Sequence, residues 1–126
     1  MNSELENLSL AGRQAVAQQD WATVPLCANS ILQRSHDSTE GYFLLGLAEK
    51  AARRPKRAIA AFEKALSLDR KRYDAAIELA SQYSISRRNG EVRELLSQYV
   101  GMLDNSPKYL DMAGTVYTEI GLPEKA

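Results

Sequence analysis

The residue types that most often carry out chemistry are scarce in this chain. It contains one histidine, His36, and one cysteine, Cys27. Neither has a second ligand or a base at the spacing that metal binding or nucleophilic catalysis requires. The sequence also lacks a glycine-rich phosphate loop, a Cys-x-x-Cys pair, a His-Glu-x-x-His run and a Gly-x-Ser-x-Gly elbow. We therefore expect no catalytic residue, no metal and no cofactor, with His36 solvated in a turn and Cys27 an inert buried thiol.

Positive charge is concentrated in the middle of the chain. Residues 39–72 carry nine basic and four acidic side chains, a net charge of +5, and the remainder carries −5 because the whole chain is neutral. Two predicted turns supply a basic edge, which consists of Arg53, Arg54, Lys56, Arg57, Arg87 and Arg88. Two interpretations stay open. The edge is either a solvated rim paired with Glu91 and Glu94, or a docking edge for an acidic partner or for a nucleotide phosphate held by an adjoining domain.

Small residues recur at a fixed interval and reveal internal repeats. Gly12, Gly46, Ala80 and Gly114 are equally spaced along the sequence. The units that this period defines are 5–38, 39–72, 73–106 and a part unit, 107–126. A period of about 34 residues is typical of stacked helical repeats, in which each unit buries its apolar face against the next.

Residues 39–72 resemble one unit of the tetratricopeptide repeat (TPR) family. The matching positions are Tyr42, Leu45, Gly46, Ala58, Phe62 and Ala65. The tyrosine that the family pattern places at Glu49 is absent there, but it returns one and two units later as Tyr83 and Tyr117. The resemblance implies one all-α domain over 1–126, a right-handed α-solenoid of about three and a half helix–turn–helix units. Gly46 is expected to lie opposite Ala58, where two helix axes approach closely.

Start and stop signals predict the helix boundaries. Ser3 with Glu6 forms a capping box, Ser106 with Pro107 marks a helix start, and Gly90 is expected to adopt the left-handed conformation in an Asn89-Gly90 turn. The predicted helices cover 4–18, 21–34, 38–52, 55–68, 72–87, 91–103 and 107–120, and Pro123 is expected to open an eighth.

The resemblance further implies a concave groove that is lined by the first helix of each unit and binds a peptide or a partner protein. By the family register, the partner-binding residues are Ser9, Arg13, Phe43, Leu47, Lys50, Ile77, Ser81, Asp111 and Thr115. The same face includes Glu40, Ile85 and Glu119. Its apolar members are either the floor of the groove or core between adjacent first helices. One subclass of the family grips the terminal carboxylate of chaperone tails with Lys and Asn, and the residues Ser9, Arg13 and Leu44 at those places disfavour that ligand.

Composition limits the remaining classes of function. The chain has 126 residues, of which 44% are hydrophobic and 25% are charged, as expected for one globular domain. Its neutral net charge gives no overall attraction to nucleic acid or to a membrane surface. The first ten residues do not read as a secretory signal, and no apolar run approaches the roughly 18 residues of a membrane span. We therefore predict a cytoplasmic protein with a peptide or protein partner.

The last unit stops after the first turn of its second helix. Because a solenoid needs a polar-faced capping helix, we expect 1–126 to be an N-terminal fragment of a longer chain. The alternative is self-association through the open C-terminal end. The segments 26–27, 31–32, 42–46, 109–114 and 120–126 resemble the repeat arrays of bacterial TPR-containing sulfotransferases. The leading prediction is a non-catalytic scaffold. The second is the arm of a sulfotransferase, which positions substrate or mediates dimerisation.

Overall fold

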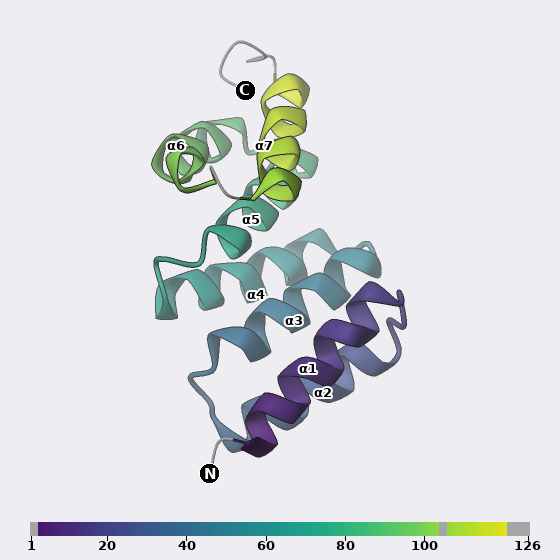
Figure 1. Cartoon of the computed structure of the whole chain (residues 1–126). Coiled ribbons are helices and arrows are strands. Elements are labelled where there is room, and N and C mark those ends of the chain that lie inside the picture. The colour runs from purple at the N-terminus through teal and green to yellow at the C-terminus, as the bar shows by residue number, and fades with distance from the viewer. Residues whose placement is uncertain (1–2, 104–105, 121–126) are drawn as a thin grey trace. The chain divides into compact units, whose positions relative to one another are not determined.

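The computed structural model describes residues 3–103 and 106–120, and these ranges are all-α with no strand (Figure 1). The helices are α1 (Ser3–Ala17), α2 (Thr23–Arg34), α3 (Thr39–Ala51), α4 (Pro55–Leu68), α5 (Tyr73–Ile85), α6 (Asn89–Tyr99) and α7 (Pro107–Glu119), and a 3₁₀ turn, η1 (Val100–Met102), follows α6. The predicted helices are confirmed in number and order up to α7. The eighth helix predicted from Pro123 lies outside the described residues.

The helices group into two compact units, and the boundary between them falls between Asp69 and Arg70. In the first unit, α1 packs on α2, α2 on α3 and α3 on α4, and α1 lies beside α3 (Figure 1). In the second unit, α5 packs on both α6 and α7. In each unit, therefore, the first helices of successive repeats lie next to one another. None of the described helices is long and apolar enough to cross a membrane.

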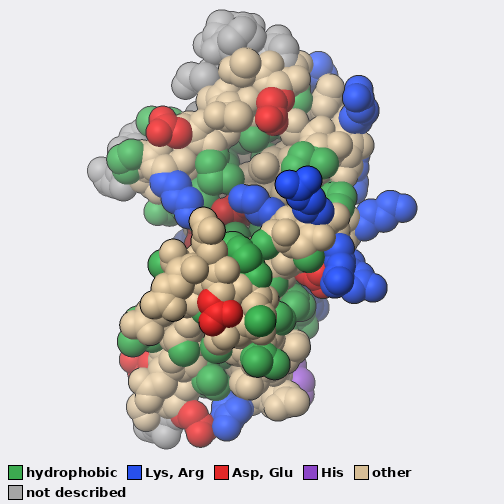
Figure 2. All heavy atoms as spheres, turned by 90° about the vertical axis from the view of Figure 1, so that its right-hand side faces the viewer, with side chains coloured by type: hydrophobic (Ala, Val, Ile, Leu, Met, Phe, Trp, Pro, Cys, Tyr) green, Lys and Arg blue, Asp and Glu red, His purple; other side chains and the backbone are tan. Residues whose placement is uncertain are grey.

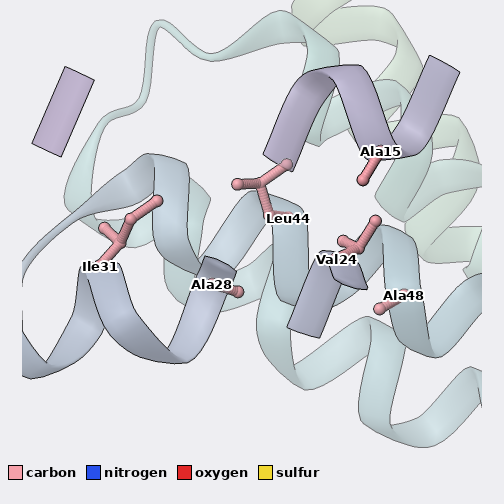
Figure 3. Close-up of a cluster of buried hydrophobic side chains, with 6 residues drawn as sticks. All are labelled: Ala15, Val24, Ala28, Ile31, Leu44 and Ala48. Carbon is pink, nitrogen blue, oxygen red and sulfur yellow. The ribbon is translucent and has the colours of Figure 1, made fainter. Parts of the chain in front are cut away.

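A cluster of aliphatic side chains forms one part of the core of the first unit. It consists of Ala15, Val24, Ala28, Ile31, Leu44 and Ala48 from α1, α2 and α3 (Figure 3). Val24, Ala28 and Ile31 recur at intervals of four and three residues, so α2 presents them on one face. Full burial of a side chain such as Leu44 contributes roughly 1.5–3 kcal/mol to folding.

Gly46 allows the ring of Phe62 on α4 to approach the backbone of α3 closely. A Cβ atom built on Gly46 would lie 2.5 Å from Cε1 of Phe62. The ring of Phe62 therefore occupies the space that a side chain at position 46 would need. That Ala58 lies opposite Gly46 stays a prediction. Ala58 is itself fully buried.

In three successive repeats, the turn between the two helices has the same backbone conformation. Gln19, Arg53 and Arg87 have φ angles of 59°, 60° and 61°, and they occupy the same position in three successive repeats. The backbone N–H of the next residue donates a hydrogen bond to the carbonyl oxygen five residues before it, as in the bond of 3.0 Å from Arg54 N to Glu49 O. This pattern is the Schellman motif, which usually places glycine at the left-handed position. The prediction of a left-handed Gly90 is wrong, because Arg87 takes that role and Gly90 lies inside α6.

Candidate partner-binding face

A polar network joins α1 to α3 on the face predicted to bind a partner. Ser9 Oγ donates a hydrogen bond of 2.8 Å to Glu40 Oε2. Arg13 donates two, from Nε to Oε2 at 2.6 Å and from Nη2 to Oε1 at 2.7 Å. Ser9 and Arg13 are one helical turn apart on α1, so they reach the same carboxylate. We call these three residues the Ser9–Arg13–Glu40 network.

Local helix physics positions Glu40. It lies in the first turn of α3, where the helix dipole favours a carboxylate. Ser38 caps that helix by accepting a hydrogen bond of 3.1 Å from Gly41 N. The Arg13 guanidinium also lies 5.6 Å from the centre of the Phe43 ring, a cation–π distance.

The network fixes orientation more than it stabilises the fold. The Arg13 side chain is 51% exposed and that of Glu40 is 19% exposed, so solvent screens the pair, and we assign it about 0.2–1 kcal/mol. Its two parallel hydrogen bonds hold both side chains in one geometry. The Arg13 charge is therefore balanced within the chain.

A hollow of about 450 Å³ opens beside the network within the first unit. It is lined by two carboxylates, three hydroxyls and two aliphatic side chains: Glu6, Glu40, Ser9, Ser35, Ser38, Leu5 and Ile31. The lining is rich in hydrogen-bond acceptors and has apolar walls. It suits a polar or basic side chain with an aliphatic stem.

Two of the predicted apolar groove residues belong to the core instead. Phe43 is 2% exposed and its ring centroid lies 5.9 Å from that of Phe62. Ile77 is fully buried. Of the two interpretations of these apolar residues, burial favours core between adjacent helices for both, because a buried ring or aliphatic group has no surface to offer a ligand. Leu47 and Lys50 are half-buried, and Ile85 is exposed.

In the second unit, α5 and α7 carry the corresponding face. Ser81 is half-buried, whereas Asp111 and Thr115 are exposed. Asp111 and Thr115 line a hollow of about 520 Å³ over one face of α7. Ser84 Oγ donates a hydrogen bond of 3.2 Å to Glu119 Oε1, which links α5 to α7. The predicted residues of this unit are thus positioned on the two first helices.

The repeat register assigns Glu40 to this face but does not reveal its central role. Glu40 is 31 residues from Ser9 and 27 from Arg13, and neither interval equals the repeat period. The contact of Glu40 with Ser9 and Arg13 arises because α1 lies beside α3 in the fold. Glu6, Ser35 and Ser38, which line the adjoining hollow, carry no sequence signal beyond their capping and turn positions.

The members of the predicted basic edge fall in different units. In the first unit Arg53, Arg54, Lys56 and Arg57 are exposed, and Arg54 lies 3.3 Å from Glu49. In the second unit Arg87 and Arg88 are also exposed. Figure 2 shows basic side chains that project from the surface into solvent.

Arg88 is the most constrained of these cations. It makes two hydrogen bonds of 2.6 Å with Glu91 and lies 4.4 Å from the Tyr83 ring centre. The Arg88 hydrogen bond lowers the pKa of the Glu91 carboxyl. In the first unit, Arg34 lowers the pKa of Glu4 in the same way through a hydrogen bond of 2.7 Å. Both ion pairs are solvent-exposed, so they affect local titration more than folding.

The single histidine and the single cysteine lie in different environments. His36 is exposed and Cys27 is buried. No group of three or more His, Cys, Asp or Glu residues in these ranges could hold a metal ion. Burial raises the pKa of the Tyr117 hydroxyl.

Comparison with known proteins identifies the fold. No family model and no curated protein sequence matches the chain. The solved TPR2B-domain:pHsp70-complex of yeast Sti1 is similar, with 18% identity over 93% of this chain and 95% of that one and a TM-score of 0.81. The Yersinia enterocolitica type III secretion translocator chaperone SycD shares 15% identity over 100% and 89%, also with a TM-score of 0.81. MamA shares 19% over 96% and 71%, with a TM-score of 0.76.

The chain therefore has the all-α fold of TPR helical repeats, as the spacing of its small residues predicted. At these identities the likeness concerns the fold alone. None of the three named structures is a sulfotransferase, so the arm of a sulfotransferase stays a prediction from sequence.

Proposed function

We propose that this chain is a non-catalytic protein-interaction module that binds an extended segment of a partner along its first helices. The observation that carries the proposal is the Ser9–Arg13–Glu40 network beside the 450 Å³ hollow. Together they form an ordered, polar surface with room for a side chain. Two of the similar structures are complexes with a protein partner, pHsp70 with Sti1 and CopN with Scc3. The cytoplasmic location remains a prediction from sequence.

The charge of this surface indicates which partner segments it favours. Arg13 is paired with Glu40, and Glu6 supplies a second carboxylate to the lining of the hollow. Leu44 is fully buried and has no surface to offer a ligand. A free terminal carboxylate would therefore meet acidic groups, and the described residues that line the hollow include no cation. We propose that the face prefers internal segments with a basic or hydroxyl-bearing side chain.

Affinity selection of displayed peptides supplies a ligand for the test. Variants Glu40→Gln and Arg13→Gln each break the network; the first keeps the side-chain size, and the second shortens the side chain. Binding should weaken by about tenfold or more, which corresponds to about 1.4 kcal/mol. Circular dichroism checks that the helices remain formed.

The chain offers a matched control. Glu4 and Arg34 form an exposed ion pair of 2.7 Å between α1 and α2, and neither residue lines the hollow. Glu4→Gln and Arg34→Gln should leave peptide affinity unchanged, because they remove the same chemistry without touching the network or the lining. Equal losses in both pairs of variants would refute the proposed face. Tighter binding of peptides with a free terminal carboxylate than of their amidated forms would refute the proposed preference.

A further inference from the structure

The three repeat turns share a backbone but differ in charge. Thr23, Arg57 and Glu91 occupy the same position in three successive repeats. In the first turn, Asp20 accepts a hydrogen bond of 2.6 Å from Thr23 Oγ1. In the third turn, Glu91 pairs with Arg88. In the middle turn, Arg54 and Arg57 stand at the positions of Asp20 and Thr23, so neither position is acidic.

We propose that this middle turn is a docking site for an acidic segment of a partner protein. We call it the basic turn and define it as Arg53, Arg54, Lys56 and Arg57, all exposed. Arg54 is paired with Glu49. No acidic partner accompanies Arg53, Lys56 or Arg57 within the described part of the chain. The turn therefore presents three uncompensated positive charges within five residues.

The backbone of the basic turn is rigid, which favours binding. Arg53 N donates to Lys50 O at 3.0 Å, Arg54 N donates to Glu49 O at 3.0 Å, and Ala58 N donates to Arg54 O at 2.9 Å. Pro55 restricts the chain at the first position of α4. A ligand that binds here orders side chains but not the main chain, so it loses less entropy on binding.

The start of α4 adds to the positive potential. The first turn of this helix contains no acidic residue, and its N-cap, Arg54, makes no side-chain capping bond. The positive end of the helix dipole therefore lies at the same turn as the cationic residues. A run of carboxylates is the complementary surface.

Overall charge favours an acidic protein segment over a polyanion such as nucleic acid. The whole chain is neutral, so it has no long-range attraction for a long nucleic acid strand with a charge at every phosphate. A patch of four side chains matches a short cluster of Asp and Glu. The site lies at a turn, away from the Ser9–Arg13–Glu40 network, and the inference does not rest on the proposed function.

A fluorescent poly-glutamate peptide is the probe, and its affinity is measured by anisotropy at several salt concentrations. Binding should appear at low salt and weaken as salt rises, because exposed charge pairs are screened. Arg57→Glu copies the neutralised third turn, since the new carboxylate can pair with Arg54 as Glu91 pairs with Arg88. This variant should lower affinity by about tenfold or more. Glutamate at the third position of a helix is favourable, so the fold is preserved.

Arg53→Gly removes a charge and supplies the residue that the left-handed conformation prefers. It should weaken binding severalfold without unfolding the chain. Arg87→Gly makes the same change at the third turn and should leave affinity unchanged. Absence of binding at low salt, or equal losses for Arg53→Gly and Arg87→Gly, would overturn the proposal. Tighter binding of an RNA oligonucleotide or of phosphatidylserine vesicles than of poly-glutamate would overturn the choice of partner.

Discussion

The hairpins α3/α4 and α5/α6 solve the same packing problem with different pairs of residues. In the first, glycine at position 46 faces the ring of Phe62. At the corresponding places of the second stand Ala80 and Leu96, both fully buried. The smaller of the two first-helix residues, Gly46, thus accompanies the larger of the two second-helix residues, Phe62. The repeat therefore keeps a similar combined side-chain volume at these two positions and the same backbone path, while the individual residues and the surface charges differ between the hairpins.

Truncation of the large partner should have the largest effect. Phe62→Ala removes a fully buried ring that also packs against Phe43. We expect a loss of about 3–5 kcal/mol in the free energy of unfolding, against about 2–5 kcal/mol for Leu96→Ala. Urea unfolding monitored by circular dichroism measures both. A loss below about 1 kcal/mol for Phe62→Ala would contradict the assigned packing.

Exchange of the small partner tests the pairing itself. Gly46→Ala places a methyl group against the Phe62 ring, and overpacking costs about 1–3 kcal/mol. Better helix propensity returns about 0.5–1 kcal/mol, so we expect a net loss of about 1–2 kcal/mol in the free energy of unfolding.

The double variant Gly46→Ala/Phe62→Leu reproduces the residue pair of α5/α6. If the two residues compensate in volume, Gly46→Ala should cost less in the Phe62→Leu background, by about 1 kcal/mol. Additive effects in the double-mutant cycle would show that the two positions are independent, and the comparison of the hairpins would fail.

The turns provide a smaller test with the opposite sign. Arg53→Gly and Arg87→Gly relieve a left-handed conformation and should stabilise the chain by about 0.5–1 kcal/mol each. Gly90→Ala should stabilise by a similar amount, because Gly90 lies in α6 and a Cβ there meets nothing within 4 Å. Destabilisation by Gly90→Ala in thermal unfolding would return the left-handed role to Gly90.

The smallest expected effect is a change in the pKa of Glu91, which pairs with Arg88 at the turn of α5/α6; the turn of α3/α4 has no such carboxylate at the corresponding position, where Arg57 stands. Arg88 lowers the folded-state pKa of Glu91 from its ordinary 4.5. The ion pair therefore contributes at pH values above 4.5, and its contribution is lost as pH falls below 4.5 through the lowered pKa. A carboxyl-detected NMR titration should show Glu91 ionising at lower pH than in the variant Arg88→Gln. Identical titration curves would exclude the pairing.

The sequence is sufficient to predict the fold because the repeat encodes it redundantly. Gly12, Gly46, Ala80 and Gly114 fix the register, and seven helices follow within the described residues. Side-chain partners are harder to predict. The small sizes of Gly46 and Ala58 indicate a close approach of two helices, but they do not reveal that the Phe62 ring fills the space at Gly46. Residue type alone gives the left-handed turn to Gly90, whereas hydrogen bonding places Arg87 there.

The candidate site is predictable in position but not in chemistry. The register locates Ser9 and Arg13, because it specifies which side of α1 they occupy. It gives no information on depth, so it places Phe43 and Ile77 at the surface although both are buried. The shared carboxylate of Glu40 depends on how α1 lies against α3, which the repeat period does not specify.

Amide chemical-shift mapping tests the central functional claim most directly. The isotopically labelled chain is titrated with a peptide obtained by affinity selection, and shifts are followed along the described helices. We predict the largest changes around Ser9, Arg13 and Glu40 on α1 and α3, with smaller changes at the end of α2 that lines the hollow and little change in α4. Changes confined to α2 and α4, with none at these three residues, would contradict the claim.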